Sequence, residues 1–409
     1  MQKKFTTKVL HTPFIKKDTH GSLNMPVYDS AAFEFDSAYD MELAFEGKKP
    51  KHAYSRITNP TVENLEQRIK NASGAFTVTA LASGMAAISN VAITLFQSGD
   101  NIITSKKLFG NTYSLFESTL KPFGISIKYT DLTNISAIEQ NIDENTQAIF
   151  VETITNPQLE VPDMKAIADL ANKKGVILIA DTTLAPLTFF DSKFHGVNIE
   201  VISSTKYISG GATSIGGVIL DYGNFDWSKY KKFEDIGKKH GPFAFFLKLK
   251  REVYRNLGAC LSPHNAYLQS LGLETFALRA ERTSENCFAL AKSLQNLRGV
   301  KAVNYPGLET SPYFDIAKKQ FNGRPGAILT FDLETKEACY KFLDKLKIIK
   351  RATNLNDNKS LIIHPASTIF SDFDNKTKTE MDIRDTMLRL SVGIEDINDL
   401  IQDIEQALK

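Results

Sequence analysis

One lysine in the middle of the chain has a setting that suits covalent chemistry. Lys206 follows an apolar run and the hydroxyl residues Ser203 and Thr205, and a glycine-rich loop comes directly after it. A lysine is a nucleophile only when it is neutral, and burial lowers its pKa towards that state. Two hydroxyl donors beside a reactive amine suit pyridoxal phosphate, a cofactor that carries both an aldehyde and a phosphate. The alternative is a chance tripeptide followed by an ordinary glycine turn.

Two further stretches could bind the phosphate of such a cofactor. In the first, a strand pattern is followed by Gly84, Met85 and a helix pattern, and the free N–H groups at a helix start attract anions. In the second, Tyr54 and Arg56 are two residues apart on an extended segment and therefore face the same way. The plainer alternatives are a tight strand-to-helix turn and a surface turn.

Two charged residues occur in otherwise apolar strand patterns. Asp181 ends the run 176–181, where a carboxylate could keep a pyridine nitrogen protonated and make the ring an electron acceptor; alternatively, it caps a turn. Arg389 lies in the apolar run 387–392, where a charge is costly unless it is paired. We expect Arg389 to bind an anion such as a substrate α-carboxylate, and a buried structural ion pair is the alternative.

Strand and helix patterns alternate through the first half of the chain. The strands are nearly continuous apolar runs, which predicts a mostly parallel sheet with helices on both faces. Ligands bind at the carboxyl ends of the strands in such sheets. The residues at or just past expected strand ends are Gly84, Asn156, Asp181 and Lys206, so we expect them to meet at one edge.

The sequence predicts three parts. Residues 1–60 contain several prolines and little periodicity, which indicates an extended arm. Residues 61–257 carry the strand and helix alternation and form the expected cofactor-binding domain. Residues 258–409 begin with a long helical passage and continue with short strands and helices, which predicts a smaller C-terminal α+β domain.

Composition excludes several classes of protein. The 409 residues carry a formal net charge of +2, so no nucleic-acid partner is indicated. The three cysteines are far apart, which argues against a disulfide framework and against a zinc site, and we expect no metal. No apolar run approaches about 20 residues, the length needed to span a membrane. We therefore expect a cytoplasmic protein.

Eight motifs spread over nearly the whole chain match one family together: Tyr54-Ser-Arg56, Ser83-Gly-Met85, Asn156-Pro157, Asp181-Thr-Thr, Ser203-Ser-Thr-Lys206, Gly272-Leu-Glu-Thr275, His364-Pro-Ala-Ser367 and Arg389-Leu-Ser-Val-Gly-Ile-Glu395. With these motifs the sequence resembles the cysteine/methionine-metabolism group of pyridoxal phosphate enzymes. The resemblance implies an α/β fold of the aspartate-aminotransferase type, known as fold type I.

The resemblance also implies a role for each site residue. Lys206 would form a Schiff base with the cofactor and act in catalysis. The other residues implied to bind the cofactor are Tyr54, Arg56, Gly84, Met85, Phe109, Asn156, Asp181, Ser203 and Thr205, and those implied to bind the substrate are Arg389, Asn354 and Tyr54. Tyr54 and Arg56 would reach the phosphate of a neighbouring subunit, which implies a homodimer and, in this family, usually a homotetramer.

Within the group the chain is most similar to the O-acetylhomoserine sulfhydrylases. Asn354 stands where the lyases and synthases tend to have serine, and an extra segment precedes Arg255. Phe109 replaces the usual tyrosine, so a hydroxyl that could protonate the leaving group is missing. Acetate needs less acid assistance than an alkyl thiolate. The implied reaction converts O-acetylhomoserine and sulfide or methanethiol into homocysteine or methionine and acetate.

Other functions stay open from the sequence. The alternatives on the same scaffold are a methionine γ-lyase and a cystathionine γ-synthase or γ-lyase, and a nucleotide site or a non-catalytic interaction role is the alternative from another class. The sulfur donor, free or bound to a carrier protein, is also open. Two departures from the family pattern, Ala212 for histidine and Asn356 for glycine, have no explanation in the sequence alone.

Overall fold

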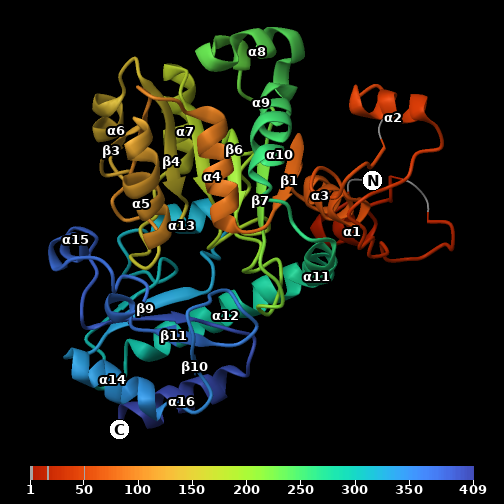
Figure 1. Cartoon of the computed structure of the whole chain (residues 1–409). Helices are drawn as coiled ribbons and strands as arrows, with labels where there is room; N and C mark the ends of the chain where they lie inside the picture. The colour runs from red at the N-terminus through yellow and green to blue at the C-terminus, as the bar shows by residue number, and fades with distance from the viewer. Residues whose placement is uncertain (1–2, 16–17, 50) are drawn as a thin grey trace. The chain divides into compact units, whose positions relative to one another are not determined.

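The computed structural model describes residues 3–15, 18–49 and 51–409 (Figure 1). The described residues divide into two compact units. The first unit holds the described residues up to 95 together with 201–209 and 213–274, and the second unit holds 96–200, 210–212 and 275–409. These units follow from contacts within the chain and do not test the expected boundaries after residues 60 and 257, which stay a prediction.

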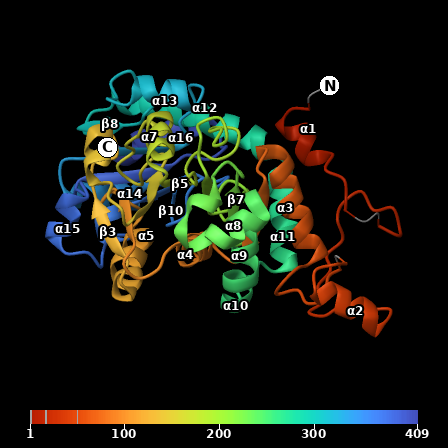
Figure 2. The same ribbon diagram turned by 90° about the horizontal axis from the view of Figure 1, so that it is seen from above.

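The first unit is built around a pair of helices. Helix α3 (Pro60–Ser73) begins at Asn59, whose side chain accepts a hydrogen bond from a backbone N–H of the first turn. Figure 2 shows α3 beside α11 (Pro263–Glu274). An ion pair of 2.7 Å between Arg68 and Glu274 joins them.

The segment before α3 is less extended than expected, because it contains two short helices. Helix α1 (Phe5–Leu10) packs against α3 and α11. Helix α2 (Ala38–Phe45) buries none of its side chains, and large apolar residues are exposed in this part of the chain: Leu23 is 95%, Phe45 67% and Tyr39 66% exposed.

Two strands of the first unit pair in antiparallel fashion. They are β1 (Thr77–Leu81) and β7 (Gly217–Asp221), and all residues of both are buried. Helix α4 (Gly84–Leu95) follows β1 after a two-residue turn and packs on both strands. The other neighbour of β7 is β6 (Ile199–Ile202), whose last two residues belong to this unit.

The same sheet continues in the second unit, where the first half of β6 belongs. The order there is β6, β5 (Ile177–Asp181), β4 (Thr146–Glu152), β2 (Asn101–Thr104) and β3 (Ser126–Tyr129). Strands β5, β4, β2 and β3 pair in parallel. This parallel pairing confirms the expected mostly parallel sheet. The connections between these strands contain α5 (Gly110–Ser114), α6 (Ile135–Asn141) and α7 (Met164–Lys174).

A second, five-stranded sheet lies in the C-terminal part of the chain. Its order is β10 (Lys350–Arg351), β11 (Leu361–Ile363), β12 (Met387–Ser391), β9 (Ile328–Asp332) and β8 (Ala302–Asn304), antiparallel except between β10 and β11. Figure 1 shows three helices of the same unit beside it: α12 (Phe276–Leu294), α14 (Lys336–Lys345) and α16 (Ile397–Leu408). The expected smaller α+β domain is therefore present.

The remaining α- and π-helices of the described residues are short: a π-helix at Leu115–Leu120, α8 (Glu234–His240), α9 (Ala244–Lys248), a π-helix at Leu249–Tyr254, α10 (Arg255–Leu257), α13 (Phe314–Gln320) and α15 (Asn375–Glu380). In the described part of the chain, no helix combines the length and the apolar character needed to cross a membrane.

Asp221 at the end of β7 predicts a pH-dependent stability. Its side chain is buried, and burial raises the pKa of Asp221 to about 7, although the N–H of Gly223 donates to it. An unfolded chain releases this proton near pH 3.9. Between about pH 4 and pH 8 the folded state therefore binds more protons than the unfolded state, and its stability falls by as much as about 4 kcal/mol through this group.

We therefore expect Asp221→Asn, which cannot ionise, to raise the thermal midpoint of the protein at about pH 8 but not at about pH 4. The measurement is thermal denaturation at both pH values, with the exposed Asp372→Asn as the control for loss of a carboxyl group. An equal rise of the thermal midpoint at both pH values would contradict the interpretation of Asp221 as a buried carboxyl group with a raised pKa.

Candidate active site

Lys206 lies in a loop that is held by hydrogen bonds from neighbouring residues. It lies four residues beyond the end of β6, is half-buried, and its backbone N–H donates to the Ser203 carbonyl at 3.1 Å. The Thr205 hydroxyl donates to the Gly216 carbonyl at 3.1 Å and accepts from the Gly216 N–H at 3.0 Å. Thr205 therefore fixes the loop that carries Lys206, in addition to its expected contact with phosphate.

The start of α4 packs closely against the same loop. A Cβ atom added to Gly84 would lie 2.7 Å from the Cβ atom of Ser203, so only glycine fits there. Ser83 Oγ accepts from the Ala86 N–H at 3.0 Å. The N–H groups of Gly84 and Met85 precede any partner within the helix and are available to an anion. This geometry suits a phosphate held beside Ser203.

Tyr54 and Arg56 lie near the surface of the first unit. The guanidinium of Arg56 donates to the Arg255 carbonyl at 2.6 Å and lies 5.4 Å from the centre of the Tyr54 ring. Tyr54 is 44% exposed. Their expected contact with the phosphate of a neighbouring subunit stays a prediction.

In the second unit, Asp181 ends β5 as the sequence predicted. Its carboxylate accepts from the Thr183 N–H at 2.9 Å. Burial raises the pKa of Asp181, and the hydrogen bonds from Thr183 act in the opposite direction. A carboxylate that is desolvated in this way interacts strongly with a cationic ring nitrogen.

Glu152 was missed by the sequence analysis. It ends β4, is 5% exposed and lies in register beside Asp181 on the neighbouring strand. Glu152 Oε1 accepts from the backbone N–H of Phe109 at 2.6 Å. An apolar run that ends in an acid was the signal, and it is the same signal that identified Asp181.

Arg389 lies in the middle of β12 and is 2% exposed. Its Nη1 donates to Asn156 Oδ1 at 3.2 Å, and its Nη2 donates to the backbone carbonyls of Thr353 and Asn354 at 3.2 and 3.3 Å. In the described residues no carboxylate lies within ion-pair distance of it, and its Nε has no partner. Burial lowers the pKa of Arg389 to about 10, so the guanidinium is still charged at neutral pH.

These contacts leave a buried cation with only neutral acceptors around it. Such a charge is unfavourable until an anion arrives. The site therefore fits a carboxylate ligand, and the alternative of a structural ion pair finds no partner among the described residues.

The two unexplained departures from the family pattern both have left-handed backbones. Asn356 has φ 52° and Ala212 has φ 56°. Asparagine tolerates this region better than most residues do, and the Asn356 side chain also donates to the Thr183 carbonyl at 3.1 Å. Asn356 thus links the segment that carries Asn354 to the turn after Asp181. The described residues give no explanation for alanine at position 212, where φ is positive.

Within each unit, the donor groups fit a part of pyridoxal phosphate. In the first unit, the amine of Lys206 suits the aldehyde, and the helix start at Gly84, which has no side chain, suits the phosphate. In the second unit, the carboxylate of Asp181 suits a protonated ring nitrogen, and Glu152 holds the backbone of the aromatic residue Phe109. The described residues contain no group of three or more potential metal ligands.

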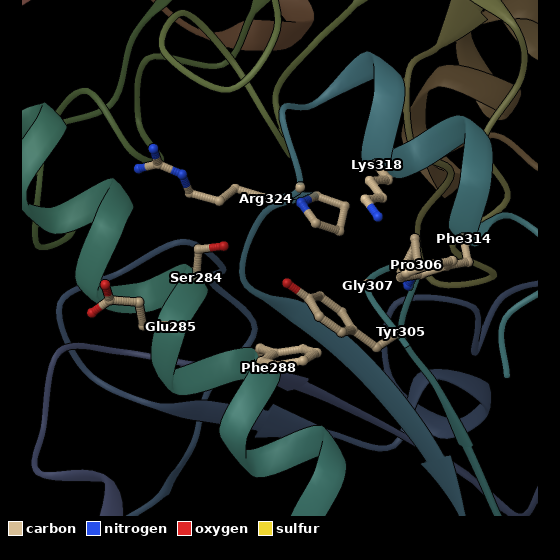
Figure 3. A pocket seen from close by; sticks show the side chains of 11 residues that line it. Ser284, Glu285, Phe288, Tyr305, Pro306, Gly307, Phe314, Lys318 and Arg324 are labelled. Atoms are coloured by element: carbon tan, nitrogen blue, oxygen red, sulfur yellow. The ribbon is translucent and has the colours of Figure 1, made fainter. Parts of the chain in front are cut away.

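A cavity of about 290 Å³ elsewhere in the second unit does not contain any of these residues. It lies between α12, α13 and the loop after β8, and the rings of Phe288, Tyr305 and Phe314 are part of its lining (Figure 3). This cavity is therefore not the site that the family resemblance implies.

Comparison with known proteins gives close relatives along nearly the whole chain. The chain is 35% identical to an O-acetyl-L-homoserine sulfhydrylase of Corynebacterium glutamicum, over 98% of this chain and 96% of that protein. It is 37% identical to O-acetyl-L-homoserine sulfhydrylase 1 of Thermus thermophilus, over 99% of this chain and 100% of that protein.

Comparison with solved structures gives relatives of the same kind. A putative O-acetylhomoserine (thiol)-lyase of Campylobacter jejuni, which contains a pyridoxyl-lysine monophosphate, matches with a TM-score of 0.94 and 34% identity over 99% of both chains. An O-acetylhomoserine sulfhydrylase of Wolinella succinogenes matches with a TM-score of 0.79 and 50% identity over 87% of this chain and 99% of that chain. The model of the Cys/Met metabolism PLP-dependent enzymes matches residues 6–409, and the chain belongs to this family.

Proposed function

We propose that the protein catalyses γ-replacement on O-acetylhomoserine: the bond between Cγ and the ester oxygen breaks, sulfide forms a bond with Cγ, and homocysteine and acetate leave. With methanethiol the product is methionine. The observation that carries the substrate class is the buried Arg389, whose neutral surroundings call for a carboxylate. The sulfhydrylases among the relatives, matched along nearly their whole length, support the choice of the acetyl ester.

Each of three site residues has a distinct task in this reaction. When pyridoxal phosphate is bound, it supplies a ring that accepts electrons from the substrate. Lys206 holds the cofactor before the substrate arrives, then takes the proton from the substrate Cα and returns it. Asp181 keeps the ring nitrogen protonated, and Arg389 orients the substrate through its carboxylate.

The ring that faces the cofactor favours a substrate with a good leaving group. Phe109 provides a flat aromatic surface without a hydroxyl. A leaving group that needs a proton therefore receives no help from this position, whereas acetate departs as a stable anion. This argument favours the acetyl ester over methionine as the substrate.

We also propose that the protein acts as a cytoplasmic homo-oligomer. The exposed apolar residues before α3 would be covered by a second copy of the chain. Tyr54 and Arg56 would then reach the phosphate site of that copy. In this arrangement each active site needs residues from two subunits.

The reaction itself is tested by supplying O-acetylhomoserine and sulfide to the purified protein and measuring homocysteine and acetate. We expect stoichiometric formation of both, and we expect Lys206→Ala to abolish turnover together with the visible absorption of the cofactor. If homocysteine does not form while methionine yields methanethiol and 2-oxobutyrate, the protein is a γ-lyase. If cysteine replaces sulfide efficiently, it is a cystathionine γ-synthase.

Arg389→Lys tests the carboxylate site. A lysine cannot keep the contacts to Asn156 and Thr353 and also bind a carboxylate with two parallel hydrogen bonds. We expect the KM for O-acetylhomoserine to rise by about tenfold or more, while the absorption spectrum of the bound cofactor stays the same. A change in the spectrum without a change in KM would place Arg389 at the cofactor instead.

Gly84→Ala tests the phosphate cradle. The added methyl group would collide with Ser203 and displace the start of α4, so we expect the dissociation constant of pyridoxal phosphate to rise by about tenfold or more. Ser89→Ala in the same helix is the control, because its hydroxyl contacts only a carbonyl of its own helix. Equal cofactor affinities in both variants would rule out this cradle.

A further inference from the structure

Two acidic side chains lie next to each other where β4 and β5 end. The strand register pairs Glu152 with Asp181, and paired residues on adjacent strands project from the same face of a sheet. Both carboxyl groups are desolvated.

Glu152 also holds the segment that carries the aromatic ring. Its Oε1 accepts from the Phe109 N–H at 2.6 Å, across 43 residues of sequence. Phe109 precedes α5, and Gly110 after it packs closely against the Ile369 carbonyl. The position of the ring is therefore set by its backbone, and Glu152 is the side chain that anchors this backbone to the sheet.

Two adjacent buried carboxyl groups oppose each other's ionisation, so a single negative charge on the pair is favoured. Asp181 is the better place for the single negative charge, since it accepts hydrogen bonds from Thr183 and is less buried than Glu152. Burial, and then the charge of Asp181, raise the pKa of Glu152 well above its ordinary value. Backbone hydrogen bonds from Phe109 and Asn156 lower the pKa of Glu152, but they are smaller effects than the two that raise it.

We propose that Glu152 is a positioning residue that acts as a neutral carboxyl group, anchoring the backbone of Phe109 and leaving Asp181 as the charged member of the pair. The inference rests on the proposed function, because it concerns the groups expected at the face and at the nitrogen of the cofactor ring. A neutral Glu152 accepts the N–H of Phe109 without adding a second negative charge beside the ring nitrogen.

The test compares Glu152→Gln with Glu152→Ala in the holoenzyme. Glutamine keeps the shape and the accepting oxygen of a protonated glutamate and cannot ionise, whereas alanine removes the anchor. We measure the visible absorption band of the bound cofactor from about pH 6 to about pH 9, and the dissociation constant of pyridoxal phosphate. Asp181→Asn is the positive control, because it removes the charge that faces the ring nitrogen.

We expect Glu152→Gln to match the wild type in band position, in pH profile and, within about twofold, in cofactor affinity. We expect Glu152→Ala to weaken cofactor binding by about tenfold, the effect of one hydrogen bond to a well-placed backbone group. A shifted band or pH profile in Glu152→Gln would show that the wild-type side chain is charged and would overturn the inference. Unchanged affinity in Glu152→Ala would overturn the anchoring role.

An infrared measurement keeps the inference testable without the cofactor. The difference spectrum between the wild type and Glu152→Gln should contain the carbonyl stretch of a protonated carboxyl group at neutral pH, and its absence would overturn the neutral state even if Glu152→Ala does not fold. A wild-type protein that binds no pyridoxal phosphate would overturn the proposed function. Normal cofactor binding in the wild type with an altered Glu152→Gln would overturn this inference alone.

Discussion

Desolvation of charge at the ends of the parallel strands is the constraint on which the site depends. The backbone of a parallel sheet places the last residue of each strand at one edge, and the apolar strands before it remove water from that edge. Asp181 and Glu152 therefore interact far more strongly than they would in solution. A weakly buried pair would ionise independently, and neither carboxyl group would influence a bound ring in a defined way.

The same physical effect acts on the cation of the second sheet. Arg389 lies in a central strand of that sheet, and its guanidinium donates hydrogen bonds to the amide of Asn156 and to two backbone carbonyls. Asn156 comes four residues after Glu152 on the loop that follows β4. A single loop thus joins the carboxyl pair to the arginine, so the residues expected at the ring and at the substrate carboxylate share one support within the second unit.

The sequence predicted the sheet and its end residues because those signals are local. An apolar run that ends in a polar residue identifies Asp181, and a glycine after a strand identifies Gly84, whatever the rest of the chain does. Glu152 shows the limit of this reasoning, since its importance comes from Phe109 and Asp181, which are distant in sequence and adjacent only after folding.

Backbone conformation was the second limit of the sequence. The left-handed φ of Asn356 and its hydrogen bond to Thr183 account for an asparagine at a position where the family usually has glycine. Neither observation can be deduced from residue type, because asparagine occurs in many other conformations. The short helix α2 was missed for a related reason: it buries no side chain, so it lacks the apolar face by which helices are recognised.

The neutral surroundings of Arg389 have a consequence for the evolution of this fold. A buried charge without a counter-ion lowers the stability of the ligand-free protein, and an apolar residue of similar volume at this position would be expected to raise it. Selection for stability alone would disfavour this arginine, whereas the proposed carboxylate binding would favour it. Binding of that carboxylate would restore part of the lost stability, so the stability of the folded protein would depend on the supply of its proposed ligand.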